Sequence, residues 1–166
     1  LSTGGATYAR FIYAAPFAVA YVLVLGQMPQ FEMPSLNVDF ALYAAVGGTA
    51  QMLATALLVY LFSFRNFAVG TTFSKTETVQ TAIFGAVILA DPLSTSAIIA
   101  ILISLAGVVA LSSAQSGISL GRIVFAWTER TAVMGLASGA CFGVSAVSYR
   151  AASLSLGGDG FLIQAA

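Results

Sequence analysis

The chain has 166 residues, of which 59% are hydrophobic and only 7% are charged, whereas soluble domains are about 45–50% apolar and about 25% charged. Six Lys or Arg and six Asp or Glu residues are too few to cover a water-facing surface, so most soluble folds are excluded and the solvent is lipid. Without histidine, and with Cys141 as the single cysteine, an internal disulfide and the usual histidine-containing zinc site are also excluded. The net charge is zero and the sequence has no basic tract, so nucleic acid is not an expected partner.

Five segments are long and apolar enough to cross a bilayer, because a membrane-spanning helix needs about 20 mainly apolar residues. The connections between them contain helix-stopping residues, such as Pro29 and Pro34 in the first and Asp91-Pro92 in the third. The pattern predicts an all-α fold, a polytopic transmembrane helix bundle whose short links make neighbouring helices antiparallel. The segments are approximately Ala6–Gly26, Phe40–Phe64, Phe67–Ala90, Thr95–Ala114 and Thr131–Ser153.

The first two segments each carry polar or aromatic groups at positions that lipid does not favour. In the first, Arg10, Tyr13, Phe17 and Tyr21 share one stripe at helical spacing. This stripe fits helix packing, and beside an arginine it also fits a wall that binds a cationic or aromatic solute. In the second, Gln51 lies at the centre, where it is a candidate for a substrate contact or for an interhelical hydrogen bond of about 0.6 kcal/mol.

The third segment, Phe67–Ala90, gathers its polar side chains on one face when it is projected as a helix at about 100° per residue. Lys75 and Glu77 lie about 12–15 Å into this helix, close to mid-membrane, where an ionisable side chain costs about 2.5–3.5 kcal/mol. They indicate buried partners or a water-filled pathway, unless the helix begins near Thr72 and Lys75 reaches the head groups. The polar face comprises Thr71, Ser74, Lys75, Glu77, Thr78, Thr81 and Gly85.

The fifth segment has glycine at every fourth position, at Gly135, Gly139 and Gly143. This small-xxx-small pattern lets two helix backbones approach closely in lipid, and it predicts a helix-packing face. The fourth segment is apolar around most of its surface, and Ser104 with Gly107 is its expected small-residue contact. A polar strip beside the glycines of the fifth segment is a candidate wall of a passage and comprises Ser138, Cys141, Ser145, Ser148 and Tyr149.

The order of these features resembles a known family of membrane proteins. A polar-fronted helix is followed by the acidic turn Ala90-Asp91-Pro92-Leu93 and by an apolar helix that closes on Ala106-Gly107-Val108-Val109. This arrangement resembles the EamA-type family of the drug/metabolite transporter superfamily, in which the turn usually reads Gly-Glu-x-Leu and the next helix carries two glycines. Here aspartate stands for the glutamate, alanine for the glycine, and only the second of the later glycines is kept. Arg10 and the helix Gly135–Arg150 also match family positions.

The resemblance implies ten helices in two inverted five-helix repeats around a central cavity. On this mapping the chain holds helices two to six, so residues 1–116 form an incomplete first repeat and residues 117–166 begin the second. One helix before Leu1 and about four after Ala166 are then missing from a multi-pass protein of the plasma or inner membrane. The basic residues of the connections place the Leu1 side in the cytoplasm, whereas the family layout places it outside, so the orientation stays open.

These features predict a secondary transporter, a permease or exporter, that moves a small organic solute such as an amino acid, metabolite or drug-like compound by alternating access. Glu77 is expected to couple transport to a proton or an exchanged solute, and no catalytic residue, metal or cofactor is expected. Two alternatives are an integral-membrane lipid-modifying enzyme, whose acids would be less scattered, and a non-transporting scaffold subunit, which leaves Lys75 and Glu77 without a purpose. The expected pathway residues are Glu77, Lys75, Ser74, Thr78, Thr81, Gln51, Arg10, Tyr13 and Tyr149.

Overall fold

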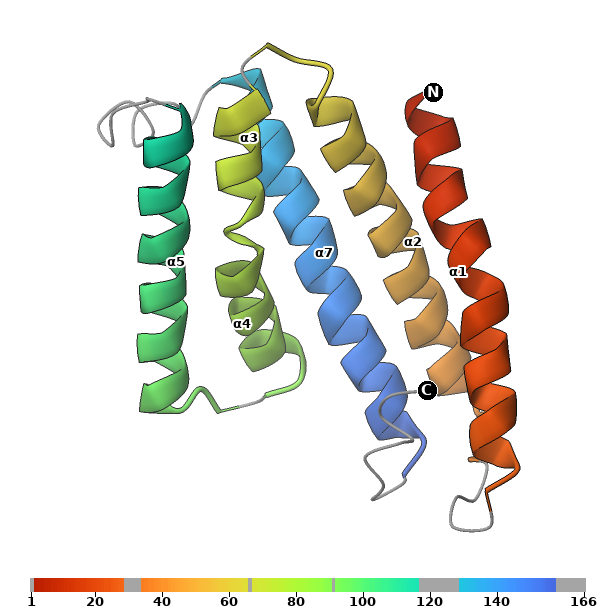
Figure 1. The fold of residues 1–166 in the computed structure, drawn as a ribbon. Coiled ribbons are helices and arrows are strands. Elements are labelled where there is room, and N and C mark those ends of the chain that lie inside the picture. The colour runs from red at the N-terminus through yellow and green to blue at the C-terminus, as the bar shows by residue number, and fades with distance from the viewer. Residues whose placement is uncertain (1, 29–33, 66, 91, 117–128, 158–166) are drawn as a thin grey trace.

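The structure, a computed structural model, describes residues 2–28, 34–65, 67–90, 92–116 and 129–157, and the regular structure in these ranges is entirely helical. The all-α prediction is therefore confirmed for the described part of the chain. The helices form adjacent columns that run down and up alternately in chain order, with α3 and α4 in one column (Figure 1). They are α1 (Thr3–Gly26), α2 (Val38–Leu61), α3 (Phe67–Ser74), α4 (Glu77–Ile88), α5 (Thr95–Ser116) and α7 (Arg130–Ser155).

Polar side chains fix the starts of three helices by accepting hydrogen bonds from otherwise unpaired backbone N–H groups. The Ser2 hydroxyl accepts from Gly5 N (3.2 Å) at α1, and the Asn37 side-chain oxygen accepts from Phe40 N (2.7 Å) at α2. At α5 the Ser94 hydroxyl accepts from Ala97 N (3.2 Å). The ends of α1, α2, α5 and α7 agree with the predicted segments to within about three residues.

The third predicted segment is not one helix. The sequence predicted a continuous helix over Phe67–Ala90, and the structure divides it into α3 and α4 at a turn formed by Lys75 and Thr76. The prediction is wrong at this point although the turn contains neither proline nor glycine. The Thr76 hydroxyl instead donates to Phe73 O (2.6 Å), a local bond that favours a turn over a regular helix.

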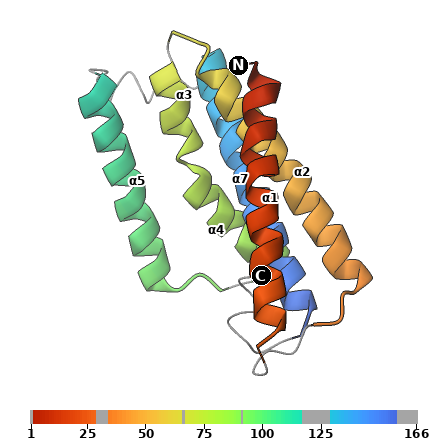
Figure 2. The same ribbon diagram turned by 45° about the vertical axis from the view of Figure 1, so that its right-hand side comes forward.

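Helix α7 is the centre of the bundle and carries most of the buried residues. It lies antiparallel to α2, and side chains join the two helices at both ends. At one end Asn37 Nδ2 donates to Ser155 O (2.7 Å). At the other end the Arg130 guanidinium lies 5.6 Å from the centre of the Phe64 ring, just beyond α2. On another side α7 packs along the whole α3–α4 column, which runs in the same direction (Figures 1 and 2). Helix α1 packs on α2, and α5 packs on α3 and α4.

Three helices in the described ranges, α1, α2 and α7, are long and apolar enough to cross a membrane. Five were predicted. The break leaves α3 with 8 residues and α4 with 12, and neither reaches the roughly 20 residues that one crossing needs. Within α5, the stretch Thr95–Gly107 is apolar but is shorter than one crossing requires. The regular structure of residues 2–28, 34–65, 67–90, 92–116 and 129–157 is thus all-helical and includes three candidate membrane-spanning helices.

Candidate functional site

The break between α3 and α4 interrupts the segment that the sequence predicts as one helix. Lys75 N still donates to Thr71 O (3.3 Å) and Thr72 O (3.1 Å), but Thr76 N donates to Phe73 O (3.1 Å), which closes a tighter turn. The helix then restarts, because Thr76 O accepts from both Val79 N and Gln80 N (3.0 Å each).

This geometry leaves main-chain groups without their regular helical partners. Among the described residues, neither Glu77 N nor Thr78 N donates a hydrogen bond to the last turn of α3. A helix interior normally satisfies these donors, whereas a helix start leaves them open. The break therefore places unpaired backbone N–H groups and the side chain of Glu77 at the same level, in the middle of the α3–α4 column.

Helix α7 covers one side of the break through Gly139. A methyl group on this glycine would lie 3.0 Å from Ser74 O and 3.3 Å from Glu77 N, so a larger residue here would require the two backbones to move apart by a few tenths of an ångström. The Gln80 side chain adds a second link to α7, because its amide nitrogen donates to Thr76 Oγ1 (2.8 Å) and to Leu136 O (3.5 Å). The turn is thus fixed from α4 and covered by α7.

The other two glycines of the fifth segment lie on the same contact, one on each side of the break. A methyl group on Gly135 would overlap the carbonyl group of Gly70 in α3, and one on Gly143 would lie 3.1 Å from the Phe84 ring and 3.2 Å from Thr81 N in α4. We call the face formed by Gly135, Gly139 and Gly143 the glycine groove. Gly107, also expected at a helix contact, is exposed, and a methyl group there would meet no described atom.

The predicted polar face of the third segment is divided by the break into residues with different environments. Ser74 is buried, with 4% of its surface exposed, and Glu77 and Thr81 are half-buried. Lys75 and Thr78 are exposed. One side of the column therefore packs on α7, and the other side presents the lysine and a threonine outward.

The remaining predicted pathway residues do not gather at the break. Arg10 and Tyr13 are exposed on α1, which packs on α2. Gln51 is half-buried on α2. Tyr149 on α7 is 45% exposed, and its ring lies against Gly47 of α2, where an added methyl group would be 3.0 Å from the ring carbons.

The serine strip of α7 also has a different environment from the one expected. Ser138 and Ser145 have no exposed surface and Ser148 has 8%. Ser138 Oγ donates to Ala54 O of α2 (2.9 Å), and the neighbouring buried positions of α2 are the small residues Gly47 and Ala50. The interpretation of these serines as a passage wall is thus corrected: they pack between α2 and α7, where their small side chains allow a close contact.

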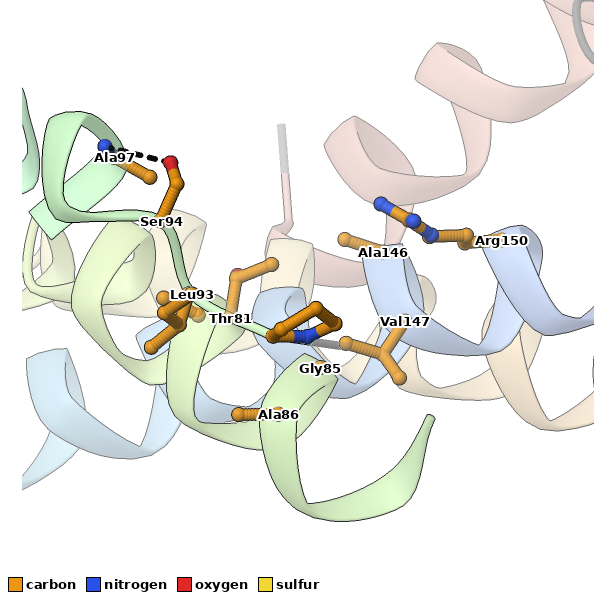
Figure 3. Close-up of a pocket in the computed structure, with 11 residues that line it drawn as sticks. Thr81, Gly85, Ala86, Leu93, Ser94, Ala97, Ala146, Val147 and Arg150 are labelled. Carbon is orange, nitrogen blue, oxygen red and sulfur yellow. Dashed lines mark hydrogen bonds between the residues drawn. The ribbon is translucent and has the colours of Figure 1, made fainter. Parts of the chain in front are cut away.

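A pocket of about 290 Å³ lies below the break, between α4, the link to α5, the start of α5 and α7. Figure 3 shows Arg150 and Ala146 of α7 on one side, Ser94 and Ala97 on the other, and Thr81 of α4 between them. Its described lining is Thr81, Ala82, Gly85, Ala86, Pro92, Leu93, Ser94, Ala97, Ala146, Val147 and Arg150.

Three residues of this region were missing from the predicted site. They are Thr76, Gln80 and Arg150, none of which is among the expected pathway residues. Arg150 lies within α7, more than one turn before its end. Its spacing of seven residues from Gly143 was the available signal, because two helical turns place both on nearby faces.

Among the described residues, no group of three or more Cys, Asp or Glu side chains could hold a metal ion. The chain matches no family model, no curated protein and no solved structure. The functional argument therefore depends on the fold, the break and the pocket.

Proposed function

We propose that the chain is part of a secondary carrier that moves a small organic solute across the plasma or inner membrane by alternating access. The observation that supports this proposal most strongly is the break of the α3–α4 column at Lys75 and Thr76 beside the half-buried Glu77. In carriers of this kind, discontinuous helices form the binding site near the middle of the bilayer.

The physical argument concerns the cost of non-helical backbone in lipid. With no water in the hydrocarbon core, unpaired N–H and C=O groups are tolerated only where protein covers them or where they line a water-filled cavity. The glycine groove covers the break on the side of Ser74, and the exposed side of Lys75 and Thr78 is then the side that requires water. A wet pathway along this side of the column satisfies the charged side chains of Lys75 and Glu77, while α7 covers the backbone donor Glu77 N on the other side.

The proposal includes the architecture that the EamA-type resemblance implies. The described helices are then five passes of a ten-helix inverted-repeat carrier, with residues 1–116 in the first repeat and residues 117–166 at the start of the second. The column of α3 and α4 is a single pass with a break at its middle. Coupling comes from a proton or from an exchanged solute, and Glu77 is the coupling residue.

The test is Glu77→Gln in the complete carrier, reconstituted in vesicles with an imposed proton gradient or with solute inside for exchange. We expect coupled solute accumulation to fall to the background of empty vesicles, because glutamine keeps the size of the side chain but carries no charge and cannot take up or release a proton.

The matched control is Glu129→Gln, which makes the same chemical change at an exposed residue at the start of α7, away from the break. It is expected to accumulate solute as the unmodified carrier does. Unchanged accumulation by the Glu77 variant at every pH and with every gradient would contradict the coupling role.

A further inference from the structure

The pocket between α4, α5 and α7 has walls that indicate the class of its ligand. We propose that it binds a small uncharged solute with one hydrogen-bonding group, which pairs with the Thr81 hydroxyl while short apolar side chains surround the rest. This inference depends on the proposed carrier function and specifies the substrate class on the helix face that carries Glu77.

The volume restricts the size of the solute. Ligand pockets generally measure about 300–1,000 Å³, so a cavity of about 290 Å³ is at the lower limit and suits a small solute better than a drug-sized one. Apart from Thr81, the α4 wall is built from Ala82, Gly85 and Ala86. A methyl group on Gly85 would meet no described atom, so this position faces open space in the pocket.

The lining favours an uncharged ligand over an ion of either sign. Arg150 is the one charged side chain among the described lining residues, and it already has an interaction partner. Most of the other lining side chains are apolar, and an ion that enters such surroundings loses its hydration without gaining an opposite charge. An uncharged solute does not meet this cost.

Two hydroxyl groups line the pocket, and they differ in availability. Ser94 Oγ already accepts from Ala97 N (3.2 Å) and shares a hydrogen bond with Ser96 Oγ (3.0 Å), so it serves to cap α5. The half-buried Thr81 hydroxyl makes no hydrogen bond with any described residue. It is thus the hydroxyl that is free to bind a solute.

The position of Thr81 connects the pocket to the break. Glu77, Thr81 and Gly85 are four residues apart, so they lie one above the other on the same side of α4. The open space at Gly85 is therefore next to the Thr81 hydroxyl, and Glu77 is one turn further towards the break. A solute bound in the pocket is adjacent to the residue proposed to couple its movement.

The first experiment measures the binding of benzyl alcohol to the complete carrier by calorimetry, with ethylbenzene as a probe of similar size that has no hydroxyl group. Thr81→Val should weaken the binding of benzyl alcohol about two- to tenfold, the range for one hydrogen bond, and leave ethylbenzene binding at least as tightly. Thr81→Ser, which keeps the hydroxyl, should retain the affinity for benzyl alcohol. Unchanged benzyl alcohol affinity in Thr81→Val, or an equal loss for both probes, would overturn the role of the hydroxyl.

Charged analogues test the class of the solute. Benzylammonium and phenylacetate carry a full charge beside the same ring. We expect each ion to bind at least about tenfold more weakly than benzyl alcohol, because no charged side chain of the described lining is free to pair with it. Binding of either ion within that factor would overturn the uncharged class.

A second pair of variants tests the location of the site. Gly85→Leu fills the pocket and should abolish binding of benzyl alcohol and ethylbenzene, whereas Gly107→Leu places the same side chain at an exposed glycine of α5 and should leave binding intact. Binding unaffected by Gly85→Leu would overturn the assignment.

The same comparison in phosphatidylcholine nanodiscs distinguishes a solute site from a lipid site. We expect the unmodified carrier to bind benzyl alcohol in nanodiscs as it does in detergent, and Gly85→Leu to bind none. If this difference disappears in nanodiscs, the pocket belongs to a lipid acyl chain and the solute class is overturned. Because binding is read without transport, these outcomes are separate from failure of the Glu77 test.

Discussion

Two serines on one face of α7 differ in hydrogen bonding although both are completely buried. Ser138 Oγ donates to Ala54 O, whereas the Ser145 hydroxyl, two turns further along, has no partner among the described residues. A buried polar group without a partner contributes a desolvation cost and no compensating bond. The same residue type therefore has opposite energetic effects at two positions of one interface.

This difference predicts the effect of removing each hydroxyl. Ser138→Ala should lower the free energy of unfolding by about 0.6 kcal/mol, the average for an interhelical hydrogen bond in a membrane protein, whereas Ser145→Ala should leave it unchanged or raise it. Reversible unfolding in mixed detergent micelles measures both. An equal loss in the two variants would show that packing volume, and not the hydrogen bond, determines stability here.

At the residue scale, the sequence identified the two ionisable residues inside a membrane segment but not the residues that pack around them. Lys75 and Glu77 stood out because charges inside an apolar segment are costly, and both lie at the break. Gln80 was left out of the polar face because helical projection assumes one unbroken helix, whereas the turn at Lys75 and Thr76 changes the angular positions of the residues after it. The role of Thr76 depends on a bond to Phe73 O that no periodicity contains.

At the scale of elements, the helix ends were predictable because capping residues and prolines act locally. Ser2, Asn37 and Ser94 each bond a backbone N–H three residues later. The break was not predictable, because no proline or glycine marks it. Helix α7 lies close to it, with Gly139 against Ser74 O and Glu77 N. That contact joins segments about 60 residues apart in the sequence.

The glycine groove predicts a graded loss of stability on substitution by alanine. Gly135→Ala should be the most damaging, because its methyl group meets the backbone of Gly70, which has little freedom to move. Gly139→Ala and Gly143→Ala should cost less, about 1–3 kcal/mol, the range for overpacking. Thermal unfolding in detergent measures the series.

Gly48→Ala is the control for this series, because its methyl group would lie at an ordinary contact distance of 3.7 Å from the Tyr149 hydroxyl. We expect its melting temperature to match that of the unmodified chain. Melting temperatures that do not follow the order of the contact distances would show that the groove does not determine the stability of the α7 contact.

At the scale of the whole molecule, the sequence predicted alternating helices but not which of them pack together. Tertiary contacts determine that α7 packs antiparallel to α2 and parallel to the α3–α4 column. They depend on matching small residues across helices, such as Gly47 beside Ser148 and Gly70 beside Gly135. Small residues occur throughout the chain, so their presence alone does not identify the partner.

The arrangement predicts which positions of the column contact water in the membrane. With Cys141 replaced by serine, a cysteine at Thr78 should react with a charged, membrane-impermeant thiol reagent, because Thr78 is exposed beside the break. A cysteine at Ser74 should be protected, because α7 covers that position and leaves 4% of the serine exposed. The reaction is measured on the carrier in intact cells and in inverted vesicles.

A cysteine at Val87 provides the control, because this residue is 77% exposed on α4 but belongs to the apolar side of the segment, which should face lipid. A charged reagent requires water, so the Val87 variant should not react. Equal reaction at positions 78 and 87 would contradict a wet side of the column and would favour the scaffold alternative.

The parallel contact between the α3–α4 column and α7 has a consequence for how the chain is made. Two parallel helices cannot be joined by a short hairpin, so α5 lies between them in the order of synthesis. A ribosome completes both halves of the broken helix and all of α5 before it reaches Gly135. Until α7 emerges from the ribosome, the nascent chain therefore lacks the helix that packs against the break at Ser74 and Glu77. The break can therefore be covered only after α7, the last described helix, has been translated.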